Sequence, residues 1–133
     1  MTPAAAAAFL RRAQRAAGIA GEIGLRLVSD ADMRALNRQF RGKDTPTDVL
    51  SFPVGAGPVA AGGCLGDIAV SIETANRQAR ARRHSLDTEI RILLLHGVLH
   101  LAGFDHETDQ GEMRRKERAL RRQLGLPPGL TER

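Results

Sequence analysis

The chain has 133 residues, which is enough for one domain with a single core and too few for two substantial domains. Its only cysteine, Cys64, excludes an internal disulfide and fits a reducing compartment, so we expect a cytoplasmic protein. No apolar run approaches the roughly 18 residues of a membrane span. Twenty basic residues, nearly all arginine, against fifteen acidic ones give a net charge of +5. This charge favours a polyanionic partner, although a codon bias towards arginine explains the arginine share equally well.

The first half of the chain carries helix and strand patterns with clear turn signals between them. Residues 3–17 predict an alanine-rich helix with proline in its first turn and glycine after its end. Alternating apolar residues over 21–30 predict a strand, and a capping box then starts a helix over about 29–41. Two short apolar runs, 49–54 and 65–71, predict further strands on either side of a glycine-rich connector.

The second half of the chain is mainly helical. We expect a polar helix over 72–83, whose arginines we interpret as a solvated face in preference to a binding surface. A central helix with Ser85 as its N-cap and Gly103 as its stop is apolar nearly all round, as expected of a helix buried against a sheet. A capping box predicts a last helix over about 109–124. This order predicts a single α+β domain over the whole chain, with a small mixed β-sheet packed with helices.

Three of the four histidines fall within eleven residues, in the segment HGVLHLAGFDH. Residues four apart share one face of a helix, so His96 and His100 present two imidazoles to one point. Gly103 stops the helix and turns the chain, which allows His106 to return as a third ligand. Three neutral imidazoles with an open fourth position are the ligand set of a catalytic zinc ion. Core histidines that only satisfy hydrogen bonds are the weaker alternative.

The spacing H-x-x-x-H-x-x-G-x-x-H is also that of the metzincin proteases, which carry a glutamate general base after the first histidine. Gly97 occupies that position here. Peptide hydrolysis needs the base to pass a proton to the leaving amine, so a peptidase is disfavoured. Phosphodiester cleavage depends more on charge stabilisation, which a metal and an arginine can supply.

These residues resemble one family closely. HGVLHLAGFDH fits the H-G-x-L-H-L-x-G-(Tyr/Phe)-D-H signature of the YbeY endoribonucleases, also called rRNA maturation factors. The segment LNRQFRGKDTPTDVLSFP, from Leu36 to Pro53, is similar to a second signature of that family, and LGDIAVS from Leu65 to a third. His84 and Ser85 precede the histidine helix as they do in the family. The matches cover most of the chain between Leu36 and His106.

The resemblance implies a zinc-dependent, single-strand-specific endoribonuclease that acts in small-subunit (16S) rRNA 3′-end maturation and in ribosome quality control. It implies RNA as the partner, without membrane or DNA, and His96, His100 and His106 as the metal ligands, with zinc or another divalent ion. It also implies a functional role for Arg41 in the cleft. A guanidinium near the metal could hold a phosphate and stabilise developing charge. The alternative for Arg41 is a surface ion pair with Asp44 or Asp48.

Four further residues are weaker candidates for the site. Asp105 lies beside a ligand in sequence and could receive an imidazole N–H, and Asp48 and Asp67 are looser candidates for the same role. Capping of turns or strand ends explains each aspartate equally well. His84 has no partner at metal-ligand spacing, so we expect it to be structural or to contact substrate.

Two other functions compete with a zinc endoribonuclease. In the first, zinc is structural and the basic faces dock a non-catalytic assembly factor on ribosomal particles, so that RNA is bound but not cut. In the second, a metallopeptidase, an unrelated carboxylate would have to replace the missing glutamate. Metal analysis beside RNA and peptide cleavage assays separates all three.

Overall fold

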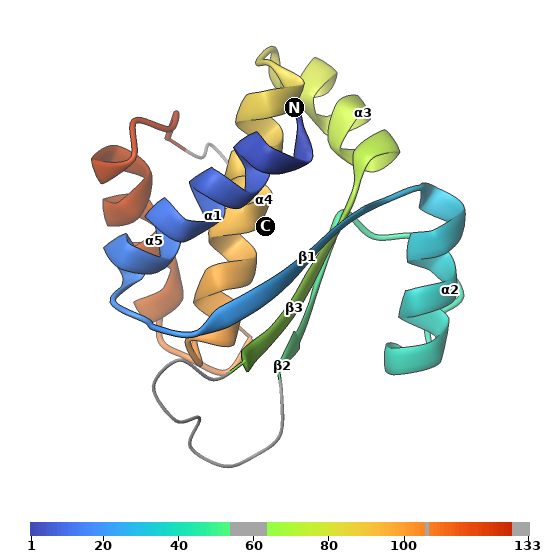
Figure 1. Cartoon of the computed structure of the whole chain (residues 1–133), viewed down its shortest axis with the longest axis horizontal. Coiled ribbons are helices and arrows are strands. Elements are labelled where there is room, and N and C mark those ends of the chain that lie inside the picture. The colour runs from blue at the N-terminus through green and yellow to red at the C-terminus, as the bar shows by residue number, and fades with distance from the viewer. Residues whose placement is uncertain (54–63, 106, 129–133) are drawn as a thin grey trace.

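The computed structural model describes residues 1–53, 64–105 and 107–128, which form one α+β domain. Figure 1 shows its helices and strands in chain order. They are α1 (Pro3–Ala17), β1 (Glu22–Val28), α2 (Asp30–Arg41), β2 (Val49–Pro53), β3 (Cys64–Ser71), α3 (Ile72–Arg82), α4 (Leu86–Leu101) and α5 (Glu112–Gln123). The glycine-rich connector predicted over 55–63 lies outside the described residues. No helix in the described ranges is long and apolar enough to cross a membrane.

The sheet has three strands in the order β1-β3-β2. β1 pairs with β3 in parallel, with Leu25 opposite Ile68, and β2 pairs with β3 antiparallel, with Ser51 opposite Ile68. The predicted small mixed sheet is therefore confirmed. β2 lies at an edge of the sheet, with one side not paired to another strand. Side chains that start on either face of the sheet can therefore extend past this unpaired edge.

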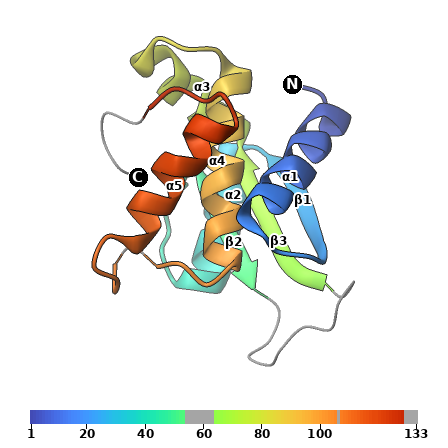
Figure 2. The ribbon, with the colours of Figure 1, turned by 90° about the vertical axis from the view of Figure 1, so that its left-hand side faces the viewer.

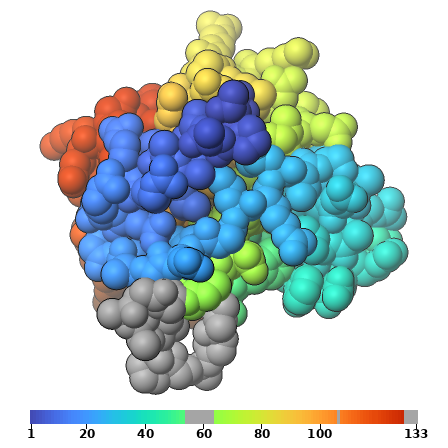
Figure 3. Space-filling view, in the orientation of Figure 1, coloured from blue at the N-terminus to red at the C-terminus, as the bar shows by residue number. Residues whose placement is uncertain are grey.

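Helix α4 lies at the centre of the domain. Ten of its residues are buried, namely all of those from Glu89 to Leu99 except Arg91, because the helix contacts the sheet on one side and other helices on the rest. Side chains of α1, β3 and α5 complete this core, while α2 closes a smaller cluster around Met33 and Leu50 on the opposite face of the sheet. Figure 2 shows α1 and α5 on either side of α4. In the space-filling view of Figure 3, α1 and β1 lie in front and cover much of α4. The expected buried central helix is confirmed.

The helix boundaries follow the predicted caps with one exception. The hydroxyl oxygens of Ser29 and Ser85 accept hydrogen bonds from the third residue after them, as predicted. The last helix begins at Glu112, three residues later than expected, because Gly111 with φ +94° interrupts the chain before it. The Asp109 carboxylate still caps this turn, since it accepts hydrogen bonds from the backbone N–H groups of Gly111 and Met113.

A hydrogen-bonded cluster around Asp30 ties the start of α2 to the start of α3. The Asp30 carboxylate accepts hydrogen bonds from the hydroxyls of Ser71 and Thr74, both at 2.6 Å, and pairs with Arg77 at 2.9 Å. The hydroxyl of Ser71, then that of Thr74, and the Arg77 guanidinium hold the pKa of Asp30 at about 2, below its ordinary value of 3.8. Both helices carry side chains that line the cleft described below, so this cluster helps to shape it.

The lowered pKa of Asp30 predicts a pH-dependent contribution to stability. A carboxylate with a depressed pKa in the folded state stabilises the fold above pH 3.8, and the contribution is lost as the pH falls towards 2. We expect Asp30→Asn to lower the free energy of unfolding by on the order of 1 kcal/mol at neutral pH, because hydrogen bonds to a charged group are lost. Urea unfolding of both proteins at pH 6 and pH 3 should show the difference shrinking at the lower pH. If wild type and Asp30→Asn differed as much in their free energy of unfolding at pH 3 as at pH 6, the lowered pKa of Asp30 would be contradicted.

Candidate functional site

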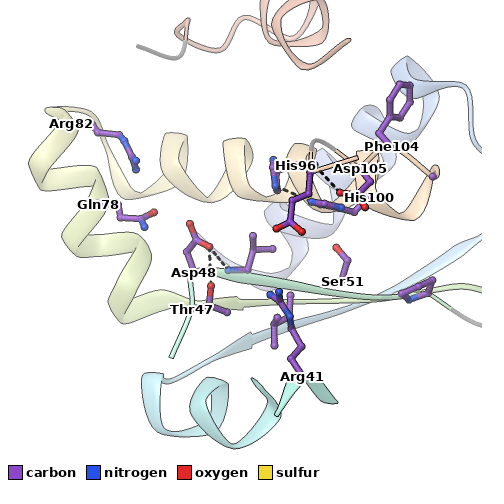
Figure 4. A pocket seen from close by; sticks show the side chains of 15 residues that line it. Arg41, Thr47, Asp48, Ser51, Gln78, Arg82, His96, His100, Phe104 and Asp105 are labelled. Carbon is purple, nitrogen blue, oxygen red and sulfur yellow. Dashed lines mark hydrogen bonds between the residues drawn. The ribbon is translucent and has the colours of Figure 1, made fainter. Parts of the chain in front are cut away.

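An open cleft of about 740 Å³ runs between α4 and β2 (Figure 4). Its lining comes from five parts of the chain: the end of α2, the loop and strand of β2, the second half of α3, the second half of α4, and the segment after α4. The lining residues that matter below are Arg41, Asp48, Ser51, Gln78, Arg82, His96, His100 and Asp105. The cleft thus collects five of the polar residues singled out in the sequence.

His96 and His100 meet at the cleft as their spacing predicts. Their Nε2 atoms lie 3.1 Å apart, and their ring centroids are separated by 4.7 Å. Helix α4 ends one turn after His96, where Gly103 has φ +100° and the N–H of Phe104 donates to the carbonyl of Leu99. The helix stop and turn expected at Gly103 are therefore present, while the return of His106 to these histidines stays a prediction.

The histidine pair fits a metal such as zinc. Two nitrogens bound to one tetrahedral zinc at about 2.0–2.1 Å are separated by about 3.3 Å, close to the observed Nε2 to Nε2 distance of 3.1 Å. Among residues 1–53, 64–105 and 107–128, no three histidine, cysteine, aspartate or glutamate side chains gather closely enough to hold a metal. The predicted third ligand, His106, lies outside the described residues.

Glu117 on α5 contacts His96 and was not singled out in the sequence. Its Oε1 lies 3.1 Å from Nδ1 of His96, and both side chains are buried. A carboxylate at Nδ1 favours the proton on that nitrogen, which leaves the Nε2 lone pair facing the cleft. A sequence signal existed: Glu117 lies on the same helical stripe as the apolar Met113 and Leu120, where a charged residue needs a buried partner.

Arg41 is the last residue of α2, and its side chain approaches the cleft from the β2 side (Figure 4). The alternative ion pairs do not form. Asp44 instead pairs with Arg34 at 2.9 Å and Arg38 at 3.8 Å, and the Arg34 guanidinium is the main reason that the pKa of Asp44 is lowered. Among the described residues, Arg41 makes no ion pair, so its guanidinium is available to an anion in the cleft.

The aspartates of the cleft also cap the local backbone. The Asp48 carboxylate accepts a hydrogen bond from the N–H of Val49 at 2.8 Å, where β2 begins. The Asp105 carboxylate accepts one from the N–H of Glu107 at 3.0 Å. Both aspartates line the cleft, so capping and a role in the site coexist for them.

Asp67 and His84 do not line the cleft. Asp67 alternates along β3 with Ile68, which packs under α4, so Asp67 is on the other face of the sheet, where its side chain leaves no room for a Cβ at Gly24. The ring of His84 lies 2.6 Å, Nε2 to Oε1, from the buried carboxylate of Glu89. His84 was expected to be structural or to contact substrate, and this buried contact favours the structural role.

Gly97 faces the sheet and not the cleft. A Cβ atom at this position would lie 2.9 Å from Cδ1 and 3.1 Å from Cγ2 of Ile68, a fully buried residue of β3. The carbonyl of Gly97 also accepts a hydrogen bond from the hydroxyl of Ser51 at 3.2 Å. Glycine is therefore needed for close packing of α4 on the sheet, and no side chain at this position could act on a substrate in the cleft.

Comparison with known proteins identifies the family of this chain. A relative from Koribacter versatilis named Endoribonuclease YbeY is 52% identical over 125 residues, covering 94% of this chain and 79% of its own length. One of the same name from Solibacter usitatus is 49% identical, covering 94% and 81%. The solution structure of TM1509 from Thermotoga maritima is 30% identical with a TM-score of 0.63, covering 93% of this chain and 84% of that one. The family model described as Endoribonuclease YbeY matches residues 3–125. The chain belongs to the endoribonuclease YbeY family and is thus a hydrolase.

Proposed function

We propose that this protein is a zinc-dependent, single-strand-specific endoribonuclease of the cytoplasm that acts in small-subunit (16S) rRNA 3′-end maturation and ribosome quality control. The observation that carries the proposal is the pair of Nε2 atoms of His96 and His100, 3.1 Å apart in a cleft that also receives Arg41. The names of the relatives supply RNA as the substrate class.

His96, His100 and His106 would hold the zinc ion, which when bound supplies a Lewis acid for a phosphate oxygen and lowers the pKa of water. Glu117 orients His96 through Nδ1. Arg41, which lines the same cleft, would hold the scissile phosphate through two N–H groups and stabilise the negative charge that grows on it. Position 97 carries glycine, so the chain lacks the glutamate with which metzincin proteases protonate a leaving amine, which favours a phosphodiester over a peptide bond.

Metal content and RNA cleavage should be lost together in His100→Ala. The substitution removes one of the two paired Nε2 atoms, so the remaining ligands bind zinc more weakly. Metal analysis and cleavage of a single-stranded RNA are measured on the same preparations of wild type and variant, with a peptide substrate beside them. RNA binding without cleavage by metal-loaded wild type would support the assembly factor instead, and cleavage by metal-free protein would refute the zinc requirement.

Arg41→Glu should abolish RNA cleavage while zinc content stays at the wild-type level. Arg41 lines the cleft but contacts neither histidine, and the reversed charge would repel the phosphate that it is proposed to stabilise. A loss of about 100-fold or more in kcat is expected from removal of one such electrostatic contact. Lys43→Glu, at an exposed position two residues later, is the matched charge-reversal control. An equal loss in both variants would mean that only net charge matters.

A further inference from the structure

The cleft continues well beyond the histidine pair. Its other end is lined by Gln78 and Arg82 of α3, which lie on the far side of the cleft from His100 in Figure 4. Arg82 contacts Glu89, seven residues before His96 on α4, which corresponds to roughly 10 Å along the helix axis at about 1.5 Å per residue. A phosphate bound at Arg82 would therefore belong to a different nucleotide from a phosphate held at the histidines.

Arg82 is held in position by buried groups. Its Nη1 lies 3.2 Å from Oε2 of Glu89, a residue with no exposed surface, and the second oxygen of that carboxylate lies 2.6 Å from Nε2 of His84. The Arg82 side chain remains 34% exposed, so the guanidinium has further N–H donors that can face the cleft. Such a fixed guanidinium loses little conformational freedom when it binds a phosphate.

The other arginines of this part of the chain differ from Arg82. Arg77 is paired with Asp30 at the start of α3. Arg80 and Arg83 are exposed and do not line the cleft, as expected for a solvated face. Only Arg82 of this group combines a buried anchor with a place in the cleft, so it departs from the solvated-face interpretation of the helix.

At the same end of the cleft, the side chain of Gln78 has an oxygen atom without a hydrogen-bond partner among the described residues. Its Oε1 is buried, yet no group in the described ranges donates a hydrogen bond to it. A buried acceptor without a partner is rare. Because the Gln78 side chain lines the cleft, a rotation of its amide would bring Oε1 to a ligand that carries an N–H or O–H donor. A ribonucleotide offers both kinds of donor, in its 2′-hydroxyl and its base.

We propose that Arg82 and Gln78 form a second nucleotide subsite, in which Arg82 binds a backbone phosphate and Gln78 accepts a hydrogen bond from the same strand. The subsite rests on the proposed endoribonuclease function, because it takes the RNA strand that is cut at the histidines. At about 3.4 Å per stacked nucleotide, it lies within about three nucleotides of the scissile phosphate. Arg82 is thus a binding residue whose effect appears in KM, whereas that of Arg41 appears in kcat.

The test measures kcat and KM of the metal-loaded protein on unstructured oligouridylates of increasing length. Arg82→Gln should raise KM about 5- to 10-fold on long RNA, leave kcat unchanged, and leave a substrate too short to reach the subsite unaffected. The slope of log kcat/KM against log salt should become shallower by about 0.7, the value for one phosphate contact to a single strand. Gln78→Met should raise KM without changing that slope.

Two further variants keep the result decisive. Arg80→Gln removes the same charge from the same helix outside the cleft and should change neither KM nor the slope. Arg82→Lys preserves the charge and should keep the slope even if loss of the Glu89 contact lowers thermal stability. Equal effects of Arg82→Gln and Arg80→Gln, or a length-independent loss in kcat, would overturn the subsite.

Failure of the subsite can be told apart from failure of the proposed function. If wild type cleaves RNA and Arg82→Gln cleaves long RNA equally well, the subsite alone is refuted. If wild type does not cleave, the dissociation constant of the same oligouridylate replaces kcat/KM. An Arg82-dependent salt slope in that binding would then support the subsite, although the endoribonuclease function had failed.

Discussion

Gly97→Glu is expected to unfold the protein and to produce no peptidase activity, although it restores the glutamate that metzincin proteases carry at this position. The Cβ alone would approach three carbon atoms of Ile68 within 3.2 Å. Overpacking of this kind costs about 1–3 kcal/mol, and an unpaired carboxylate in a buried position adds several kcal/mol. Together these two costs are a large part of the roughly 5–15 kcal/mol free energy of unfolding of an ordinary domain.

The Gly97 prediction is checked by circular dichroism and thermal unfolding of the soluble fraction, with a peptide cleavage assay beside them. Gly97→Ala should be folded but less stable by about 1 kcal/mol, because the gain in helix propensity offsets part of the overpacking. Arg91→Glu, at a half-buried position of the same helix, is the matched control and should stay folded. A stable Gly97→Glu protein would show that α4 can move away from the sheet, contrary to the packing described here.

Local signals in the sequence predicted most of the fold. Serine caps such as Ser29 and Ser85 act within three residues, and strand alternation needs only neighbouring side chains, so both are readable without tertiary structure. The spacing of His96 and His100 is equally local, which is why their convergence was foreseen. The late start of α5 was missed because the capping box pointed to Asp109, whereas the positive φ of Gly111 decides the boundary.

The parts of the site that depend on tertiary packing were not predictable in the same way. The alternation along β3 places Asp67 and Ile68 on opposite faces, but only the packing of α4 on Ile68 decides which face borders the cleft. The ion pairs of Asp44 with Arg34 and Arg38, which free Arg41, depend on how the loop after α2 folds back. The contact of His96 with Glu117 joins residues 21 positions apart through the packing of α5 on α4.

Glu117→Gln is expected to lower the zinc affinity of the protein by about 10- to 100-fold, the usual effect of removing the carboxylate behind a metal-bound histidine. The amide keeps the size of the side chain, but it no longer offers a charged acceptor at both oxygens, so the Nδ1 proton of His96 is held less firmly. Competition with a chromogenic chelator measures the affinity, and RNA cleavage in excess zinc shows whether activity returns when the site is filled.

Glu117 also neutralises a buried cation, and this second role must be separated from the first. Nη2 of Arg121 lies 3.7 Å from Oε2 of Glu117, and the Arg121 side chain is only 4% exposed. Loss of the carboxylate leaves that guanidinium uncompensated, which typically costs about 3–5 kcal/mol in a buried pair. Arg121→Met removes the cation but keeps Glu117 at His96, so the double variant Arg121→Met with Glu117→Gln should recover stability without recovering zinc affinity. If zinc affinity followed stability in all three variants, Glu117 would act through the packing of α5 and not through Nδ1 of His96.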